Sequence, residues 1–504
     1  MKLHILIGGK AGQGINKISG IISKILAKQG YFIFNYQDYP SVIRGGNKFN
    51  IVAISDNRIG SIESRIDGII ALNPETVEIH KRLLKTPGFI IDIRKFEKDN
   101  LGININVALA AALIKVLGFS KETLIKEIDS EFKDKQAVNA ANIGYESEEQ
   151  RFKLKKINRE IKSLSGSRAI AQGALNSKID FYFSYPMTPA TRVMEELAIT
   201  QINSKNNLVV FQPENEIAAV NASLGASFAG ARTMTGTSGG GFDLMTEALS
   251  FQGQSEIPLV IYLASRSGPG TGVPTYTSQA DLDVALRAGH GEFPRIVIAP
   301  GDPIEAIEKT NEAFYLSEKF SSLAIILSDK HLAESEFSSD RKPNKILNLP
   351  AKKSMFKASS YEHDNFGNTT ESAEITKKNA ERRIAKYDAI KKECKKFEMI
   401  KLYGKKDSKN LIIAWGSTKT AILDAIEGLD CKFLQVLYLK PMSGRIKEEI
   451  IKAKKVILIE NNSTGQLGRL IREKTGIKIK NRILKYDSLP FKSDELKKEI
   501  MEIK

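Results

Sequence analysis

The chain has 504 residues, more than one compact core usually holds, and about three domains are therefore expected. Its composition, 42% hydrophobic and 27% charged, is that of a globular protein, and no apolar run is long enough to cross a membrane. The net charge of +16 comes from dispersed lysines without interleaved aromatic residues, which favours a solvated surface over an acidic or nucleic-acid partner. We expect a cytoplasmic protein that binds neither membranes nor nucleic acid.

The residues that most often bind metals are few and scattered. Cys394 and Cys431 are the only cysteines, too few for a four-thiolate iron–sulfur site and not spaced as Cys-x-x-Cys. The five histidines form no run that would present ligands from one helical face. We therefore predict no metal site in this chain, and any cluster must belong to another subunit.

Residues 1–165 alternate short apolar runs with helical patterns, an order typical of an α/β layer fold. Expected strands are 3–7, 31–36, 49–54, 67–72 and 88–93, and expected helices are 15–29, 75–85 and 103–117. The first run reads as a buried strand and not as a signal sequence, because Gly8 and Gly9 end it too early. From about Glu127 to Ser165 the chain becomes polar and charged, which places a domain boundary near residue 165.

Two more α/β units follow, at 166–335 and 409–504, joined by a polar connector at 336–408. In the first of them we expect a helix at 167–177 and strands at 208–211, 259–264, 295–299 and 323–327. The connector includes a long charged helix at 374–397. The last unit should hold strands 410–414, 433–437 and 455–459 with helices 419–428, 445–452 and 465–475. The predicted fold class is α/β, with three α/β domains.

A glycine-rich loop at residues 8–14 follows the first strand and opens a helix, where backbone N–H groups favour an anion. Its spacing is not Gly-x-Gly-x-x-Gly, and no Lys-Ser/Thr follows Gly14. Three interpretations stay open: NAD(P) binding with Asp38 on the ribose, a tight turn at Gly12 and Gly14, or another phosphate-bearing ligand. Arg44, before two glycines, either approaches a phosphate or is solvated in a turn.

A second pattern places carboxylates directly before a helix rich in Ala, Ser and Gly, from residue 214 to residue 230. Small side chains let such a helix lie close to a cofactor. In thiamine-diphosphate enzymes a glutamate at this place hydrogen-bonds N1′ of the aminopyrimidine and helps to form the reactive ylid. Glu216 fits the pattern and Glu214 is the second choice. The alternative is a carboxylate that only caps the helix.

Five blocks occur in the order found in the 2-oxoacid:ferredoxin oxidoreductase family, which this chain resembles along nearly its whole length. They are Tyr-Pro-Met-Thr-Pro at 185–189, Thr-Gly-Thr-Ser-Gly-Gly-Gly-Phe at 235–242, Arg-Ser-Gly-Pro-Gly-Thr-Gly-Val-Pro-Thr at 266–275, and the blocks 289–294 and 460–467. Met187 replaces Ile, Gly240 replaces Pro and Gly270 replaces Ser of the family patterns. These departures leave the substrate preference open.

The resemblance implies a role for each domain. Residues 1–165 are similar to the family's gamma domain, fused ahead of an alpha subunit. Residues 166–335 resemble the pyrimidine-binding thiamine-diphosphate domain, and 409–504 resemble a transketolase C-terminal domain with a mainly structural role.

The resemblance also implies the site residues. Glu216 becomes the catalytic partner of N1′, while Thr188, Arg266 and Tyr185 bind the 2-oxoacid. The remaining candidates are Pro186, Ser238 and Gly239 for thiamine diphosphate, and Gly12, Gly14 and Arg44 for coenzyme A. No metal-binding residue is assigned to this chain.

The segment that would hold the cofactor's diphosphate is missing, because Gly301-Asp302 is followed by Pro and not by Gly. The resemblance therefore implies a beta subunit that carries Mg²⁺ and a [4Fe-4S] cluster, in an αβ or (αβ)2 assembly. The expected reaction is oxidative decarboxylation with ferredoxin as electron acceptor and coenzyme A as acyl acceptor. A non-redox two-chain thiamine-diphosphate decarboxylase and an NAD(P)-binding dehydrogenase are the alternatives.

Overall fold

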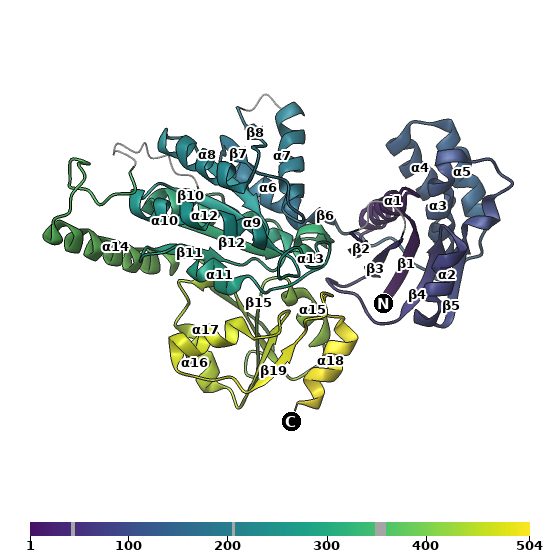
Figure 1. The fold of residues 1–504 in the computed structure, drawn as a ribbon. Helices are drawn as coiled ribbons and strands as arrows, with labels where there is room; N and C mark the ends of the chain where they lie inside the picture. Colours follow the sequence, from purple (N-terminus) through teal and green to yellow (C-terminus); the bar gives the residue numbers. More distant parts are fainter. Residues whose placement is uncertain (42–45, 204–206, 348–358, 504) are drawn as a thin grey trace. The chain divides into compact units, whose positions relative to one another are not determined.

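The computed structural model describes residues 1–41, 46–203, 207–347 and 359–503 (Figure 1). The chain forms two compact units. The first unit comprises Met1–Leu164, Ser335–Arg341 and Lys492–Leu496, and the second comprises Ser165–Glu334, Lys342–Phe491 and Lys497–Lys504. The described strands form three sheets with helices packed on them, which confirms the predicted α/β class.

The first unit is built on a seven-stranded sheet in the order β5-β4-β1-β3-β2-β13-β6. Its strands are β1 (Lys2–Lys10), β2 (Phe32–Asp38), β3 (Asn47–Ser55), β4 (Ile66–Ala71), β5 (Leu84–Asp92), β6 (Lys162–Ser165) and β13 (Glu336–Ser339). Its helices are α1 (Ile15–Lys28), α2 (Pro74–His80), α3 (Ile105–Leu117), α4 (Lys121–Phe132) and α5 (Lys135–Glu146), with short 3-10 turns at Lys81–Leu83, Ile93–Phe96 and Gly102–Asn104. β3 lies antiparallel between β1 and β2, so these two strands are not neighbours as a dinucleotide-binding fold requires.

The core of the first unit lies where α1 and α3 cover β1 and β3. Ile5 and Val52 face each other across the two strands and belong to the same cluster as Ile18 of α1. Ten of the residues of α3 are buried, so this helix is apolar nearly all round, as expected for a helix enclosed by other elements. α3 is therefore the helix against which α1, α4 and α5 pack.

The polar stretch from Glu127 is only partly a linker, because it contains the second half of α4 and all of α5. α5 buries Ala137, Ala140 and Ala141 against the core of the first unit. A Cβ on Gly144 would lie 2.1 Å from the carbonyl oxygen of Ala108, so α5 crosses α3 at backbone contact. Alanine and glycine bury little apolar surface each, which is why the sequence pattern did not indicate a packed helix.

The second sheet, in the second unit, has seven strands in the order β17-β11-β12-β10-β9-β7-β8. Its strands are β7 (Phe181–Phe183), β8 (Val209–Phe211), β9 (Thr233–Thr237), β10 (Leu259–Ser265), β11 (Arg295–Ile298), β12 (Leu323–Asp329) and β17 (Tyr438–Lys440). The helices around it are α6 (Gly166–Asn176), α7 (Thr191–Asn203), α8 (Glu216–Phe228), α9 (Gly239–Leu244), α10 (Thr246–Ser255), α11 (Leu282–Arg287), α12 (Pro303–Phe320), α13 (Lys330–Glu334) and α14 (Ala373–Cys394). Apart from β17 its paired strands are parallel, and β10 and β12 are buried throughout, as in doubly covered sheets.

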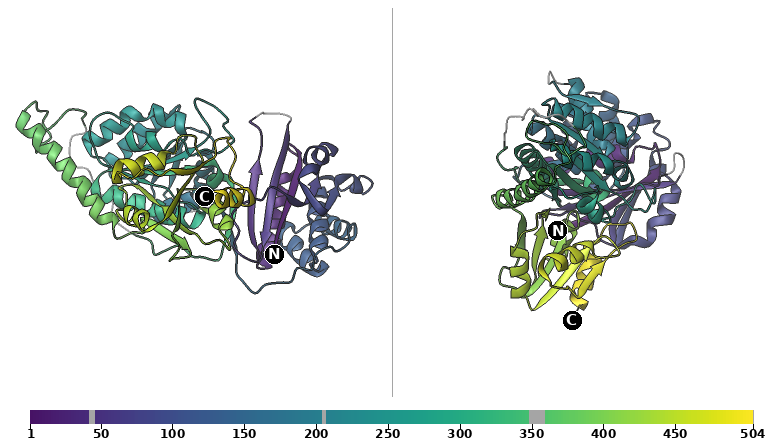
Figure 2. Two further views of the ribbon diagram at one scale, coloured as in Figure 1. Left: turned by 90° about the horizontal axis from the view of Figure 1, so that it is seen from below. Right: turned by 60° about the vertical axis from the view of Figure 1, so that its left-hand side comes forward.

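The third sheet, also in the second unit, has five strands in the order β14-β16-β15-β18-β19. Its elements are β14 (Ile400–Gly404), β15 (Asn410–Trp415), α15 (Thr418–Ala425), β16 (Lys432–Val436), α16 (Arg445–Lys452), β18 (Lys455–Glu460), α17 (Gln466–Thr475) and β19 (Asn481–Leu484), and the chain ends with α18 (Ser493–Glu502). Figure 2 shows the charged helix α14, in green, at the margin of the second unit. Three short strands cross the predicted domain limits: β13 joins the first sheet, β14 the third and β17 the second.

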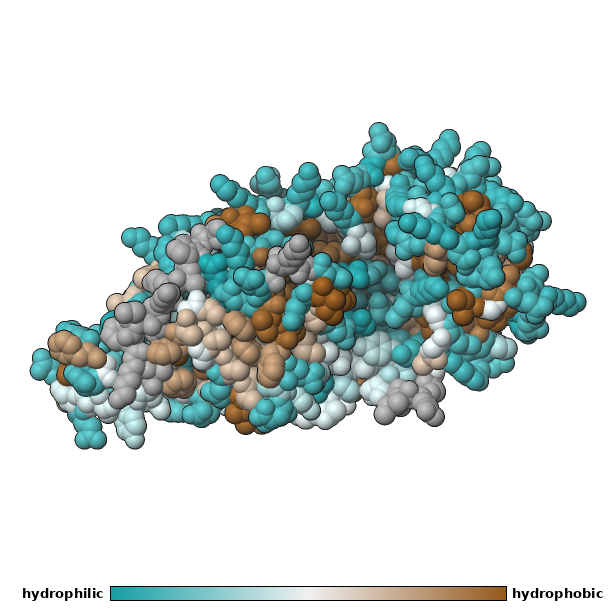
Figure 3. Space-filling view, turned by 90° about the horizontal axis from the view of Figure 1, so that it is seen from above, coloured by the Kyte–Doolittle hydropathy of each residue, from teal (hydrophilic) through white to brown (hydrophobic). Residues whose placement is uncertain are grey.

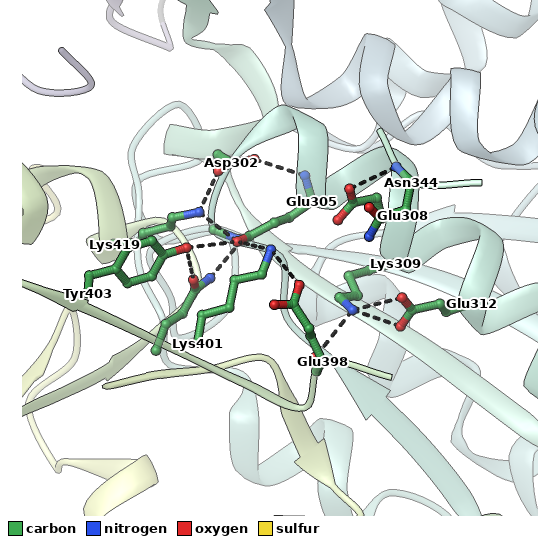
Figure 4. Close-up of polar contacts among 12 residues, drawn as sticks. Asp302, Glu305, Glu308, Lys309, Glu312, Asn344, Glu398, Lys401, Tyr403 and Lys419 are labelled. Atoms are coloured by element: carbon green, nitrogen blue, oxygen red, sulfur yellow. Dashed lines mark hydrogen bonds and ion pairs between the residues drawn. The ribbon is translucent and has the colours of Figure 1, made fainter. Parts of the chain in front are cut away.

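Buried charges join α12 to the third sheet within the second unit (Figure 4). Glu305 in the first turn of α12 is 0% exposed. Its Oε1 lies 2.6 Å from Lys419 Nζ of α15 and 3.3 Å from Lys401 Nζ of β14. Gln435 Nε2 of β16 donates to Glu305 Oε2 at 2.7 Å, and Lys419 also pairs with Asp302. Each of these buried charges therefore has a partner from another element.

The pKa shifts within this cluster favour the charged forms of both its acidic and its basic side chains. Burial alone would raise the pKa of the Glu305 carboxyl, but Lys419 and Lys401 outweigh it and lower that pKa below its usual range. Burial acts to lower the pKa of Lys419, and Asp302 and Glu305 reverse this and raise it. Removing one partner would leave an ion in a low-dielectric site without compensation, which is strongly unfavourable.

We expect Lys419→Met to lower the free energy of unfolding by about 3–5 kcal/mol, because Glu305 loses its nearest counter-charge. Urea unfolding can be followed by the fluorescence of Trp415, the only tryptophan, which is buried in the third sheet. Lys405→Met is the matched control, since the ion pair of Lys405 with Asp430 is exposed and such pairs contribute about 0–1 kcal/mol. Equal losses for the two variants would contradict the expectation.

Candidate functional site

The carboxyl ends of the parallel strands bring several sequence motifs to one edge of the second sheet. β7 runs into residues 184–190, β9 into 238–242 and β10 into 266–275, while β8 leads to Glu216 at the start of α8. The strand order β10-β9-β7-β8 makes these loops neighbours. Ligands of open parallel sheets bind in the crevice beyond the carboxyl ends of the strands. The geometry therefore makes this edge the candidate site.

Glu216 is the first residue of α8 and is 3% exposed. Its Oε1 has no hydrogen-bond partner among the described residues. Asn215 caps the helix, because its side chain accepts a hydrogen bond from the Ala218 N–H at 2.8 Å. The capping role considered for Glu216 thus belongs to Asn215, and Glu214 is exposed. A buried carboxylate oxygen without a partner indicates a ligand that supplies one.

The glycine loop after β9 lies against Glu216. A Cβ on Gly241 would lie 2.1 Å from Thr237 Oγ1 and 2.7 Å from Glu216 Oε1. A Cβ on Gly240, where the family pattern has Pro, would meet nothing within 4 Å. Ser238 Oγ is buried and has no hydrogen-bond partner in the described part of the chain. Gly241 is therefore required for close approach, whereas Gly240 borders open space.

Arg266 follows β10 and is half-buried. Its Nη1 donates a hydrogen bond to the Thr188 carbonyl oxygen at 3.1 Å, so two of the predicted substrate residues are in contact. Burial lowers the pKa of the guanidinium, while the charges of Asp281 and Glu216 act in the opposite direction. A guanidinium has several N–H donors in one plane, and this one is placed to bind a carboxylate with those that do not contact Thr188.

The other predicted residues of the loop after β7 are less well placed than Thr188. Tyr185 is exposed and Pro186 is half-buried, and no hydrogen bond between either of them and Glu216 occurs among the described residues. Their neighbour Met187 does reach the site, since Thr237 Oγ1 lies 3.9 Å from its sulfur. The roles of Tyr185 and Pro186 stay predictions.

Asp281, which the sequence analysis missed, lies at the same edge. A Cβ on Gly239 would lie 2.8 Å from Asp281 Oδ2, and this oxygen is buried without a hydrogen-bond partner among the described residues. Burial raises the pKa of this carboxyl to about 6, with Asp243 adding to the rise and Ser265 and Arg266 opposing it. In the sequence, an acidic residue directly before a short helix is expected to be an N-cap, so nothing in the sequence marked Asp281 as a candidate site residue.

The loop after β18, which carries the family-like Glu-Asn-Asn-Ser-Thr-Gly-Gln-Leu block, holds the segment before Asp281. Gln279 N donates to Asn461 O at 2.8 Å, and Asn461 N donates to Gln279 Oε1 at 2.9 Å. Gln466 Nε2 donates to Ala280 O at 2.7 Å. The third sheet therefore positions one wall of the candidate site.

The first glycine loop lies in the first unit. Gly12 and Gly14 have φ angles of 90° and 89°, a region that favours glycine. Gly14 caps α1 without a side-chain hydrogen bond, and a Cβ there would lie 2.2 Å from Asn106 Nδ2. Asp38, the candidate for a ribose, accepts a hydrogen bond from a tyrosine of its own strand at 3.0 Å. Arg44 lies outside the described residues.

Three further observations concern metals, cysteines and membranes. Within residues 1–41, 46–203, 207–347 and 359–503, no group of three or more His, Cys, Asp or Glu side chains is arranged to hold a metal ion. Cys394 and Cys431 are both buried and free. None of the helices in the described ranges combines the length and apolarity needed to span a membrane.

Family models match two parts of the chain. One, described as pyruvate flavodoxin/ferredoxin oxidoreductase, thiamine diphosphate-binding, covers residues 172–399, and the other, described as pyruvate ferredoxin/flavodoxin oxidoreductase, covers residues 4–93. The 2-oxoacid:ferredoxin oxidoreductase alpha subunit of a Sulfolobus species is 30% identical over 100% of this chain and 97% of that protein. Its counterpart from Saccharolobus solfataricus is 29% identical over 99% and 97%.

A solved structure gives the same likeness over the full length. It is the 2-oxoglutarate:ferredoxin oxidoreductase from Magnetococcus marinus with 2-oxoglutarate, coenzyme A and succinyl-CoA bound. The TM-score is 0.88 and the sequence identity 25%, over 99% of both chains.

We expect Gly241→Ala to lower the free energy of unfolding by about 1–3 kcal/mol, because the added methyl group must displace Thr237 or Glu216 from a packed site. Gly240→Ala is the matched control in the same helix, where alanine meets no neighbour and is favoured over glycine by about 1 kcal/mol. Thermal unfolding of both variants measures the difference. The packing argument is wrong if the two substitutions change stability equally.

Proposed function

The chain belongs to the 2-oxoacid:ferredoxin oxidoreductase family as an alpha subunit, and we propose that it contributes the activating and substrate-binding half of a shared thiamine diphosphate site. In the proposed reaction the C1–C2 bond of a 2-oxoacid breaks and carbon dioxide leaves. The acyl group passes to the sulfur of coenzyme A, and the electron pair passes to ferredoxin. The observation that carries the proposal is Glu216, a buried carboxylate with an unpartnered oxygen beside the glycine loop.

The residues at the candidate site fit thiamine diphosphate. When bound, this cofactor supplies a carbon nucleophile and an electron sink for decarboxylation. Glu216 Oε1 would hold the proton shared with N1′ of the aminopyrimidine and so promote proton loss from the thiazolium carbon. Ser238 Oγ offers a second buried polar atom, Gly239 gives backbone access, and Pro186 lies in the loop after β7.

The substrate would be bound by the loops after β7 and β10. Arg266 pairs with the carboxylate of the 2-oxoacid through a fork of two N–H groups, and the Thr188 hydroxyl donates a hydrogen bond. The contact between Arg266 and the Thr188 carbonyl supports this, because it brings the Arg266 side chain to the backbone of residue 188. Tyr185, at the exposed rim, is the third substrate residue in the proposal.

A beta subunit would complete the site. Exposed apolar side chains lie on the elements that carry it: Phe211 at the end of β8, Ile217 next to Glu216, and Leu244 at the end of α9. Figure 3 shows apolar side chains reaching the surface among hydrophilic ones. We assign this surface to a beta chain that brings Mg²⁺ for the diphosphate and a [4Fe-4S] cluster, in an αβ or (αβ)2 assembly. Two buried cysteines cannot supply the thiolates of such a cluster, which supports placing it in the partner.

Coenzyme A is assigned to the first unit. The backbone N–H groups at the start of α1, behind Gly12 and Gly14, form a place where phosphate groups are favoured. Arg44 remains a candidate on sequence grounds. The similar enzyme from Magnetococcus marinus was solved with coenzyme A bound, which supports coenzyme A as the acyl acceptor.

We expect Glu216→Gln to reduce kcat/KM of the complex about 10²–10⁴-fold, because a neutral amide cannot exchange the proton with N1′. The assay is 2-oxoacid- and coenzyme-A-dependent viologen reduction by the chain co-expressed with its beta partner. Glu214→Gln is the matched control, since Glu214 lies two residues away and is exposed, and it should retain activity.

Full activity in Glu216→Gln would overturn the proposed role of this residue. Activity that needs neither coenzyme A nor an electron acceptor would instead indicate a non-redox thiamine-diphosphate decarboxylase. Reduction of NAD(P) in place of viologen would favour the dehydrogenase alternative.

A further inference from the structure

Ser488, in the segment between β19 and α18, has no role in the proposed function, although it contacts the loop that follows Arg266. Its φ angle is 68°, a conformation that residues other than glycine rarely adopt. Its Oγ lies 2.7 Å from Oγ of Ser267, the residue next to Arg266, and its carbonyl oxygen accepts a hydrogen bond from the Thr277 N–H at 3.1 Å. An uncommon backbone conformation beside a binding loop points to a function for the residue that adopts it.

The loop after β10 closes on itself above these contacts. Ser267 and Val273 form an antiparallel bridge, in which the Val273 N–H donates to Ser267 O at 2.9 Å. Residues 268–272 between them are exposed. A Cβ on Gly272 would lie 2.1 Å from Ser267 O, so this closure requires glycine. Ser488 therefore holds the loop at its base, with one contact on each side of the exposed tip.

Ser488 is itself held in place by its neighbours. Asn461 Nδ2 donates to Lys485 O at 3.2 Å and to Leu489 O at 3.1 Å, so one amide group bridges the segment that contains Ser488. The backbone of Asn461 is in turn hydrogen-bonded to Gln279 at the wall of the candidate site. The hydroxyl and carbonyl groups of Ser488 thus occupy fixed positions, as a residue that supports a binding group requires.

Arg266 depends on support of this kind. Its guanidinium donates one hydrogen bond to the Thr188 carbonyl, and its other N–H groups are those proposed to bind the substrate. A paired contact with a carboxylate is directional, and a displacement of about 1 Å weakens it strongly. The position of the guanidinium follows that of its own backbone, and the next residue along the backbone is Ser267.

We propose that Ser488 is a positioning residue, whose hydrogen bond with the Ser267 hydroxyl holds the loop after β10 so that Arg266 faces the 2-oxoacid carboxylate. The inference rests on the proposed role of Arg266. Either hydroxyl can be the donor of this bond, so the loss of either one breaks it. The C-terminal part of the chain then affects substrate binding without contacting the substrate.

Steady-state kinetics of the complex with its beta partner test this. We expect Ser488→Ala and Ser267→Ala each to raise KM for the 2-oxoacid about 3–10-fold, the effect of one neutral hydrogen bond, with smaller changes in kcat and in KM for coenzyme A. The double variant should be no worse than either single one, because both remove the same bond. Ser321→Ala is the matched control, since Ser321 also has a positive φ angle, 47°, but lies before β12, at the opposite edge of the sheet.

Ser488→Gly separates the hydroxyl group from the backbone conformation. Glycine adopts a φ angle of 68° without strain but offers no hydroxyl. This variant should unfold at about the wild-type temperature and still raise KM for the 2-oxoacid as Ser488→Ala does. A wild-type KM in either variant would overturn the proposal. Equal rises in KM for the 2-oxoacid and for coenzyme A would also contradict it, because they would show a purely structural residue.

Amide hydrogen exchange of residues 266–277 gives a readout that needs no activity. Ser488→Ala should speed exchange at Val273, whose N–H closes the loop, and Ser321→Ala should match the wild type. Unchanged exchange in Ser488→Ala would sink the inference. An inactive wild-type complex would instead overturn the proposed function, and the exchange measurement would still decide whether Ser488 holds the loop.

Discussion

The structure of the second unit depends on one constraint, that Glu305 is buried as an anion. An ionised carboxylate taken out of water is tolerated only with counter-charges and hydrogen bonds around it. Here these come from Lys401, Lys419 and Gln435, on three different elements of the third sheet (Figure 4). The third sheet can therefore dock against α12 only in the position that brings these groups to Glu305, and its other contacts with the second sheet follow from that position.

The most important of those other contacts reaches the candidate site. With the third sheet docked, Asn461 and Gln466 meet Gln279 and Ala280 and fix the chain just before Asp281. The third sheet thus provides none of the proposed catalytic or substrate residues, yet it determines where one wall of the site stands. The structural role expected of the C-terminal part would then consist of holding this wall in position.

Much of the fold followed from apolar periodicity, because strands such as β10, β12 and β15 are runs of aliphatic residues and most expected elements lie within a few residues of the observed ones. β9 was missed, since Thr-Met-Thr-Gly-Thr is buried throughout but mostly not aliphatic. The small strands β13, β14 and β17 pair with partners far along the chain, so local pattern could not assign them to a sheet. The family resemblance is confirmed by full-length relatives, but it did not single out Asp281, whose character comes from its surroundings.

Four carboxyl groups of the second unit that have buried oxygens show how surroundings separate support from function. Glu305 is compensated on both oxygens, and Glu460 accepts hydrogen bonds from Trp415, Asn462 and two backbone N–H groups. Glu216 and Asp281 each keep one buried oxygen unpartnered among the described residues. Each such oxygen costs about 1–3 kcal/mol of stability, and packing alone gives nothing in return. Since both lie at the carboxyl edge of one parallel sheet, where a bound ligand can supply the missing donors, the cost is what identifies the site.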